Sequence, residues 1–379
     1  MRVALLAPDL DPGYGWARYA LDLAQALSAQ GVTVRALVQV TAAPQEEIGL
    51  DVCPVLPHLV PPTRGFLRRS LLTIPAVRHA LDGCDLVHVV AEPYAPLAAL
   101  AAGRRPLIVT AHGTYVPQTV RRRLVGLLYR WAYRRAHLIA VSGYTAEQVR
   151  AVLQGADPAV IHNGVHVARF ERAAPAPEKR GPTILSSGGV KARKGTHVLI
   201  DALALIRALV PDAQLVITGR QDDSAYRAWI EAQIARLGLA SAVQMPGVVP
   251  EDTLIGWYQH ADVFALPSLN VGDRFEGFGL VVLEAGACGL PVVGTRGSGV
   301  EEAVIEGETG LLVPQDDAPA LAAAITRLLD DPALRARMGE AGRQHARAQD
   351  WSAVAARVRA VYESALAAHA AGNSRRDIG

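Results

Sequence analysis

The chain alternates, twice over, between short apolar runs typical of buried β-strands and longer runs with helical periodicity. In the first half the apolar runs are Val3–Ala7, Val32–Val40, Leu86–Val90, Leu107–Ala111, Leu138–Val141 and Val160–His162. In the second half they are Thr183–Ser187, Gln214–Thr218, Val243–Met245, Val263–Ala265 and Val292–Gly294. Parallel strands need helical crossovers to connect them, so this alternation predicts an α/β fold with two Rossmann-like, doubly wound parallel sheets.

A stretch rich in proline and charge, residues 171–182, separates the two halves and has no periodicity. Such composition is typical of a linker. A chain of 379 residues is also too long for one ordinary core. We therefore predict an N-terminal domain over 1–170, a linker, a C-terminal domain over 183–350 facing it across a cleft, and a C-terminal helix and tail over 351–379 that return to the N-terminal domain.

Composition excludes several function classes. A net charge of +2 is too small to favour nucleic acid as a partner. Cys53, Cys84 and Cys288 show no CxxC spacing, so they predict neither a disulfide framework nor a zinc site and favour a reducing compartment. The N-terminus does not resemble a signal peptide, and no apolar stretch has the length of a membrane span. We predict a cytoplasmic protein.

Two glutamates, Glu276 and Glu284, stand out in the stretch from Phe275 to Ala285. Neither is expected to fill a core, because ionised groups are rarely buried without partners. The apolar run Leu280–Cys288 predicts a buried helix, and a helix start at Gly279 would present free N–H groups to an anion. A phosphorylated, hydroxyl-rich ligand fits this combination.

A second loop combines glycine with positive charge after the predicted strand Thr183–Ser187. Gly188 and Gly189 follow the strand, and Arg193 and Lys194 stand where the next helix begins. Such side chains meet a diphosphate through charge-assisted hydrogen bonds, each worth about 1.5–3 kcal/mol. A solvated basic turn is the alternative, but lysine occurs in the chain only at positions 179, 191 and 194. The loop lacks the Gly-Lys-Ser/Thr pattern of a Walker loop.

The other candidate loops follow further predicted strands, where doubly wound folds bind their ligands. Gly13-x-Gly15 comes after the first strand, but Arg18 replaces the third glycine of the dinucleotide fingerprint. Gly15 therefore either allows the backbone to approach a ligand closely or only makes the turn between strand and helix tight. His112, beside Gly113, is either a ligand-facing side chain or a satisfied structural histidine.

Three more predicted strands are followed by polar residues. These residues could bind a ligand, or they could only stabilise a turn or a helix start. Ser142 and Asn163 belong to types common in turns. Glu301 and Glu302 follow the predicted strand Val292–Gly294, and one of them could bind a ligand. Acidic residues at a helix start are equally explained by the helix dipole.

An arginine-rich stretch interleaved with apolar residues predicts an amphipathic basic helix. Its arginines include Arg121, Arg122, Arg123, Arg130 and Arg134, and the apolar residues between them include Leu124, Leu127 and Trp131. Such a helix can lie on anionic lipid at the inner membrane face. A charged, solvated face of the domain is the alternative.

Several motifs together resemble the retaining GT-B glycosyltransferases, specifically glycosyltransferase family 4, also described as glycosyl transferases group 1. The resemblance covers nearly the whole chain. It is densest in Ala261–Val263, Leu266–Ser268, Phe275–Ala285, Gly289–Val293 and Thr309–Val313.

The resemblance implies a metal-free hexosyltransferase whose C-terminal domain binds a nucleotide sugar, UDP- or GDP-linked, and whose N-terminal domain binds a hydroxyl acceptor. Glu276 would contact the sugar hydroxyls and Glu284 the ribose. The implied catalytic residues are Glu276, His112, Arg193 and Lys194, with the latter two at the diphosphate. The implied donor-binding residues are Gly15, Glu284, Gly279, Leu280, Gly188, Gly189, Asn163 and Glu302. The family needs no cofactor and is described as using front-face substitution, in which Glu276 acts by positioning.

The chain departs from the family pattern in three places. Family members commonly carry Gly-Arg where this chain has Gly188-Gly189, an aspartate where it has His166, and a shorter loop than Leu269–Arg274. The alternative functions are an NDP-sugar-binding protein and a GT-B epimerase or phosphorylase. A Rossmann oxidoreductase is disfavoured by the incomplete glycine fingerprint.

Overall fold

The computed structural model describes residues 1–11, 15–42, 49–59 and 65–374, so Gly13 lies outside the described residues. The chain forms two compact units, Met1–Asn163 with Trp351–Gly379, and Gly164–Asp350. The first segment of unit one thus ends at Asn163, whereas the predicted N-terminal domain ends at residue 170. Helix α7 (Val167–Glu171) contacts α11 of the second unit, and the Val165 amide donates to the carbonyl of Gln349 at 3.0 Å, so the chain changes unit before α7.

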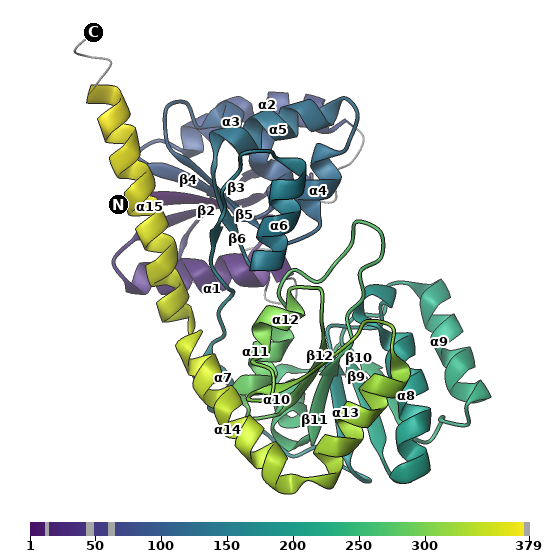
Figure 1. The fold of residues 1–379 in the computed structure, drawn as a ribbon. Helices are drawn as coiled ribbons and strands as arrows, with labels where there is room; N and C mark the ends of the chain where they lie inside the picture. Colours follow the sequence, from purple (N-terminus) through teal and green to yellow (C-terminus); the bar gives the residue numbers. More distant parts are fainter. Residues whose placement is uncertain (12–14, 43–48, 60–64, 375–379) are drawn as a thin grey trace. The chain divides into compact units, whose positions relative to one another are not determined.

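The first unit is built on a seven-stranded parallel sheet of order β3-β2-β1-β4-β5-β6-β7 (Figure 1). Its strands are β1 (Arg2–Leu6), β2 (Thr33–Gln39), β3 (Asp51–Leu56), β4 (Leu86–Val89), β5 (Leu107–Ala111), β6 (His137–Ala140) and β7 (Ala159–Val160). Strand β3 was not predicted. It lies at the sheet edge and contains Pro54, which an edge strand tolerates, and most of its side chains are partly exposed, so it lacks an apolar signature.

The helices of the first unit are α1 (Gly15–Ala29), α2 (Phe66–Ala80), η1 (Glu92–Tyr94), α3 (Ala95–Ala101), α4 (Tyr115–Val120), α5 (Val125–Arg135), α6 (Gly143–Val152) and α15 (Trp351–Ser374). The prediction of one arginine-rich helix is wrong, because α4 ends at Val120 and residues 121–124 form a turn before α5. Gly126 allows this turn to be tight. A Cβ there would lie 2.4 Å from the Val120 carbonyl oxygen, so only glycine lets α5 approach the end of α4.

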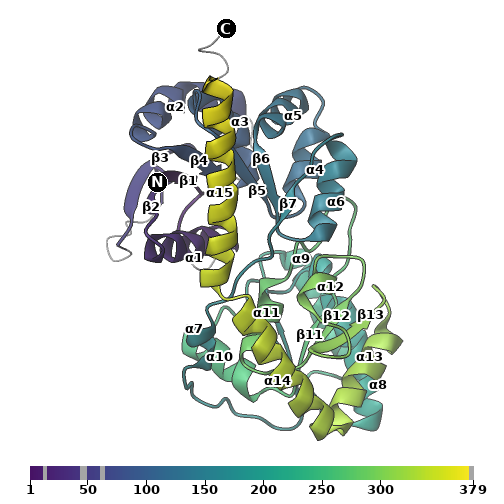
Figure 2. The ribbon, with the colours of Figure 1, turned by 60° about the vertical axis from the view of Figure 1, so that its left-hand side comes forward.

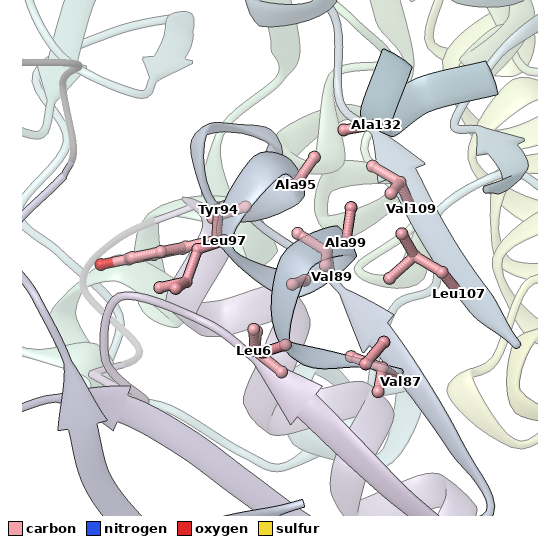
Figure 3. Packing of buried hydrophobic residues seen from close by; sticks show 14 of the residues in the cluster. Leu6, Val87, Val89, Tyr94, Ala95, Leu97, Ala99, Leu107, Val109 and Ala132 are labelled. Carbon is pink, nitrogen blue, oxygen red and sulfur yellow. The ribbon is translucent and has the colours of Figure 1, made fainter. Parts of the chain in front are cut away.

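Two apolar layers cover the sheet of the first unit, as expected for a parallel sheet. On one face, side chains of β1, β4 and β5, among them Leu6, Val89 and Val109, pack on η1 and α3 (Figure 3). On the other face, α1 packs beside α15, which begins at the buried Trp351 (Figure 2). The C-terminal helix is thus part of the first unit's core.

The second unit has a six-stranded parallel sheet of order β10-β9-β8-β11-β12-β13. Its strands are β8 (Thr183–Ser187), β9 (Gln214–Thr218), β10 (Val243–Gly247), β11 (Val263–Leu266), β12 (Val292–Thr295) and β13 (Gly310–Val313). Together with the first sheet, this confirms the predicted fold class of two Rossmann-like parallel sheets followed by C-terminal helices.

The helices of the second unit are α7, η2 (Ala192–Lys194), α8 (Thr196–Leu209), α9 (Ser224–Arg236), α10 (Glu251–His260), α11 (Leu280–Ala287), α12 (Val300–Ala303), α13 (Ala318–Asp330) and α14 (Pro332–Ala348). The helical C-terminal region is interrupted near Asp350, where the predicted C-terminal domain ends, and also at Asp331. The Asp331 carboxylate accepts the Leu334 amide at 2.8 Å and Pro332 occupies the first turn, so Asp331 starts a new helix.

Candidate functional site

Two loops at the carboxyl edge of the second unit's sheet carry the predicted charged residues. Residues 188–195 connect β8 to α8, and residues 267–279 connect β11 to α11. Strands β8 and β11 are neighbours in the sheet, so the two loops begin side by side. The amide of Leu269 donates to the carbonyl of Arg193 at 2.8 Å and joins them.

Glu276 sits between two cations from the neighbouring loop. Lys194 Nζ lies 2.9 Å from Glu276 Oε2, and Arg193 Nη1 donates to the same oxygen. The exposed fractions of the Glu276 and Lys194 side chains are 13% and 10%, against 28% for Arg193. The structure therefore brings together three of the four predicted catalytic residues in one largely buried cluster.

The cluster keeps Glu276 ionised. Burial alone would raise the pKa of Glu276, but the charges and hydrogen bonds of Arg193 and Lys194 outweigh it and lower that pKa to about 2. Burial lowers the pKa of Lys194, and the Glu276 charge opposes that effect. At neutral pH this carboxylate can accept hydrogen bonds from hydroxyls, but it carries no proton to donate.

Close backbone contacts fix both loops. Gly195 has φ +66° and a Cβ there would lie 1.8 Å from the Pro267 carbonyl oxygen, so residue 195 must be glycine for the loops to meet. The Gly299 amide donates to the Glu276 carbonyl at 2.9 Å. A Cβ at Gly299 would lie 1.9 Å from the Gly277 carbonyl oxygen, so the β12–α12 loop also holds Glu276 in place.

Gly188 and Gly189 line this edge without offering free amides. Both N–H groups donate to the Thr218 carbonyl, at 3.2 and 2.9 Å. A Cβ at Gly188 would lie 3.1 Å from Lys194 Nζ, so the missing side chain leaves room beside that ammonium. These glycines can allow a ligand to approach closely, but their amide N–H groups already donate to the Thr218 carbonyl.

Helix α11 begins as predicted, with Gly279 as its left-handed N-cap residue and Leu280 as its first residue. Glu284 lies partly buried on this helix. Its Oε2 accepts a hydrogen bond from Tyr258 Oη at 2.8 Å. Burial and the Glu284 charge raise the pKa of Tyr258 well above its usual value, so Tyr258 remains a donor that orients the carboxylate. Sequence reasoning missed Tyr258, because it comes from α10 and carries no local signal.

The two acidic residues of α12 have different surroundings. The Glu301 carboxylate accepts the Gly297 amide at 2.7 Å and thereby closes its own loop. Glu302 is partly buried on the same short helix and its amide bonds the Gly299 carbonyl at 3.3 Å. Glu301 thus has a structural partner, and Glu302 is the acidic residue of this helix that the resemblance implicates in donor binding.

The remaining predicted site residues belong to the first unit. His112 directly follows β5, and its ring packs edge-on against Tyr19 with centroids 4.5 Å apart. Burial lowers the pKa of His112 to about 3, so its imidazole is neutral. Gly15 is the first residue of α1, and a Cβ there would meet no atom of the described residues within 4 Å, so none of their side chains or backbone requires glycine at that position.

Sequence reasoning also missed Glu92, whose carboxylate accepts the backbone N–H of His112 at 2.7 Å. Glu92 is fully buried, and burial raises its pKa to about 7. It stands two residues after the apolar run Leu86–Val90, so the rule that selected the other strand-end loops would have selected this one too.

The structure gives a hydrogen-bonding role to one of the two predicted residues that follow β6 and β7, Ser142, but not to the side-chain oxygen of the other, Asn163. Ser142 is the N-cap of α6 and accepts the Thr145 amide at 3.0 Å, which supports the structural interpretation. Asn163 is buried at 5% exposure after β7, and its Oδ1 has no hydrogen-bond partner among the described residues. Within the same ranges, no three histidine, cysteine or carboxylate side chains gather as a metal ion would require.

Sequence comparison identifies the family. Residues 14–169 match the profile described as "Glycosyltransferase Family 4", and residues 167–345 match "Glycosyl transferases group 1". The chain belongs to glycosyltransferase family 4. It is a glycosyltransferase, and its cluster of one ionised carboxylate and flanking cations is suited to bind hydroxyls and phosphates together.

Two curated relatives are similar to nearly the whole glycosyltransferase. A "Phosphatidyl-myo-inositol mannosyltransferase" of Mycobacterium leprae (strain TN) is 32% identical, covering 96% of this chain and 97% of the relative. A "D-inositol 3-phosphate glycosyltransferase" of Jonesia denitrificans is 30% identical and covers 96% of each chain.

Solved structures support the GT-B fold. Sucrose-phosphate synthase from Thermosynechococcus elongatus superposes with a TM-score of 0.80 at 25% identity, covering 97% of this chain and 100% of that one. Anabaena HepE, solved in complex with UDP and glucose, has a TM-score of 0.77 at 20% identity, covering 96% and 100%, and supports the fold alone.

Proposed function

We propose that this glycosyltransferase moves a hexose from a UDP- or GDP-linked donor to a hydroxyl acceptor, without metal and with retention of the anomeric configuration. The observation that carries the proposal is the position of Glu276 between Arg193 and Lys194. In that arrangement the carboxylate accepts hydrogen bonds from the sugar, and the cations neutralise the departing diphosphate, as a metal ion does in other transferases.

Retention follows most simply from substitution on the face that the diphosphate leaves. A covalent double displacement requires a carboxylate free to attack the anomeric carbon. Glu276 is instead held by two cations, which lower its pKa to about 2 and reduce its nucleophilicity. The leaving phosphate then accepts the acceptor's proton, while Glu276 positions the sugar.

For the acceptor we propose an inositol-containing molecule, either a lipid or a phosphate. Both relatives described above are named for inositol acceptors, and both are similar over 96% of this chain. Other relatives are named for GDP-mannose as donor, which makes GDP-mannose the first donor to test.

A lipid acceptor also fits one surface of the first unit. Leu124, Leu127 and Trp131 are 87%, 71% and 42% exposed. Their neighbours in the sequence include five exposed arginines, Arg121, Arg122, Arg123, Arg130 and Arg134. Within the described residues no helix is long and apolar enough to cross a membrane. We propose that this basic, apolar surface contacts an anionic membrane peripherally.

A donor panel tests the catalytic proposal. The protein is incubated with UDP-, GDP- and ADP-sugars, with and without inositol acceptors, in the presence of EDTA. We expect transfer from one donor, and a product of unchanged anomeric configuration by proton NMR. An inverted product, or loss of activity with EDTA, contradicts the mechanism; no turnover of any donor favours a binding protein instead.

The membrane proposal has a separate test in co-sedimentation with vesicles of phosphatidylglycerol or of phosphatidylcholine. We expect binding to the anionic vesicles that weakens with salt, and weaker binding of the variant Leu127→Ser with Trp131→Ser. Equal binding to both kinds of vesicle, or none, contradicts peripheral contact through this surface.

A further inference from the structure

The loop that carries Arg193 and Lys194 holds a third cation, Lys191. Lys191 is partly buried. Burial lowers its pKa most, followed by the charge of Arg193, whereas Asp222 and Glu276 raise it. The Lys191 ammonium is therefore within electrostatic reach of Glu276. No ion pair joins it to a carboxylate anywhere in the described ranges.

The local charges do not balance. Arg193 and Lys194 share one carboxylate, and Lys191 adds a further positive charge. Arg220, which follows β9, is already paired with Asp222 at 2.9 Å. Partly buried cations in excess are costly unless an anion accompanies them. A bound diphosphate, with at least two negative charges, would supply that compensation.

The backbone excludes a cationic side chain from position 189, two residues before Lys191. Gly189, the second residue after β8, has φ +91°, and a Cβ there would lie 2.1 Å from the Arg220 carbonyl oxygen. No side chain, arginine included, fits at position 189 without moving the β9 loop. Lys191 is two residues further on, where its amide bonds Thr196 Oγ1 at 3.3 Å and its carbonyl accepts the Lys194 amide at 3.0 Å.

We propose that Lys191 binds the phosphate groups of the nucleotide-sugar donor and supplies the charge that Gly189 cannot carry. This inference rests on the proposed function, because it assumes a nucleotide-sugar donor. Lys191 would then act with Arg193 and Lys194 as a three-cation site, in which two of the cations also hold Glu276.

Binding of nucleoside diphosphates tests the inference. Lys191→Met keeps the length of the side chain and removes its charge. We expect it to weaken UDP or GDP binding about tenfold, as loss of a charge-assisted hydrogen bond would. Binding of the bare nucleoside should not change, and Lys191→Arg should restore most of the affinity for the diphosphate.

Lys179→Met is the matched control. Lys179 pairs with Asp262 at 2.7 Å, at the amino end of β11 and away from the phosphate loop, so its loss should not alter diphosphate binding. An unchanged dissociation constant in folded Lys191→Met overturns the inference while the proposed function stands. If the wild-type protein binds no nucleoside diphosphate at all, both fail.

Chemical protection gives a readout that does not depend on substitutions. Lysine occurs only at positions 179, 191 and 194, so acetylation with acetic anhydride can be followed at each site by peptide mass spectrometry. We expect UDP or GDP to protect Lys191 and not Lys179. Equal labelling of Lys191 with and without the nucleotide that binds contradicts a phosphate contact.

Discussion

Lys194 Nζ lies 2.9 Å from Glu276 Oε2, the oxygen to which Arg193 also donates. Both cations therefore form ion pairs with one carboxylate in the ligand-free protein, and they lower its pKa to about 2. The position of Glu276 is thus linked to the positions of the two cations that we propose bind the diphosphate. A substitution of Glu276 should nevertheless change kcat more than it changes nucleotide affinity.

Glu276→Gln should separate these constants. The amide keeps the shape of the side chain but removes its negative charge. That charge would accept hydrogen bonds from the sugar hydroxyls and stabilise the positive charge that develops on the sugar. We expect kcat to fall about 100-fold, with little change in the dissociation constant of the nucleoside diphosphate. Steady-state kinetics and calorimetry measure the two. Glu306→Gln, an exposed residue paired with Arg296 at 2.6 Å, is the control, and a Glu276→Gln enzyme with normal kcat would refute the role.

Gly195→Ala should damage both folding and donor binding. A left-handed residue changed to alanine costs about 1 kcal/mol from φ alone, and the new Cβ would also meet the Pro267 carbonyl at 1.8 Å. We expect a further 1–3 kcal/mol, roughly, from that clash, and weaker nucleotide binding because Arg193 and Lys194 move.

Gly238→Ala provides the comparison for Gly195. Gly238 has nearly the same φ, +67°, but a Cβ there would meet nothing within 4 Å. Urea denaturation should show only the conformational cost of about 1 kcal/mol, with unchanged nucleotide affinity. Equal losses of stability in the two variants would mean that contact with Pro267 is unimportant.

Tyr258→Phe should weaken donor binding with little loss of activity at saturating donor. It removes the hydroxyl that donates to Glu284 at 2.8 Å, so this carboxylate, which we expect to bind the ribose, is less firmly oriented. We expect up to about a tenfold rise in the dissociation constant for the nucleoside diphosphate.

A matched tyrosine lies in the other unit. Tyr362→Phe removes the hydroxyl that lies 2.6 Å from His88 Nδ1 in the buried core of the first unit. It should cost about 1–3 kcal/mol of stability by leaving His88 without that partner, and should not change nucleotide affinity. If the effects of the two substitutions on binding were the same, Tyr258 would not act through Glu284.

Glu92 should make stability fall as the pH rises through neutrality. In the folded protein its pKa is raised to about 7, from a usual value of 4.5, because it is buried. Between these values the folded state holds a proton that the unfolded state has lost. The stabilisation is therefore complete below pH 4.5 and is lost as the pH rises through 7. The free energy of unfolding of wild type relative to Glu92→Gln should decrease from pH 5 to 8, and parallel curves would show that Glu92 does not titrate in this range.

The local structure of the main candidate site could be predicted from sequence, because its determinants are local. The helix that starts at Gly279 and the strand Thr183–Ser187 followed by glycine and basic residues appear where the patterns placed them. The arginine-rich stretch was mispredicted as one helix, because the turn at 121–124 depends on the contact between Gly126 and Val120. The edge strand Asp51–Leu56 escaped prediction because partial exposure leaves no apolar run.

By itself the sequence determined the alternation of strands and helices, the two sheets and which loops carry charge, because periodicity and glycine act over a few residues. Only the tertiary structure decided that Arg193 and Lys194 meet on one oxygen of Glu276, that Tyr258 orients Glu284, and that Glu92 holds the amide of His112. Each of these contacts joins residues from different elements. Their energies depend on burial and on neighbouring charges, which exist only once the sheets have formed.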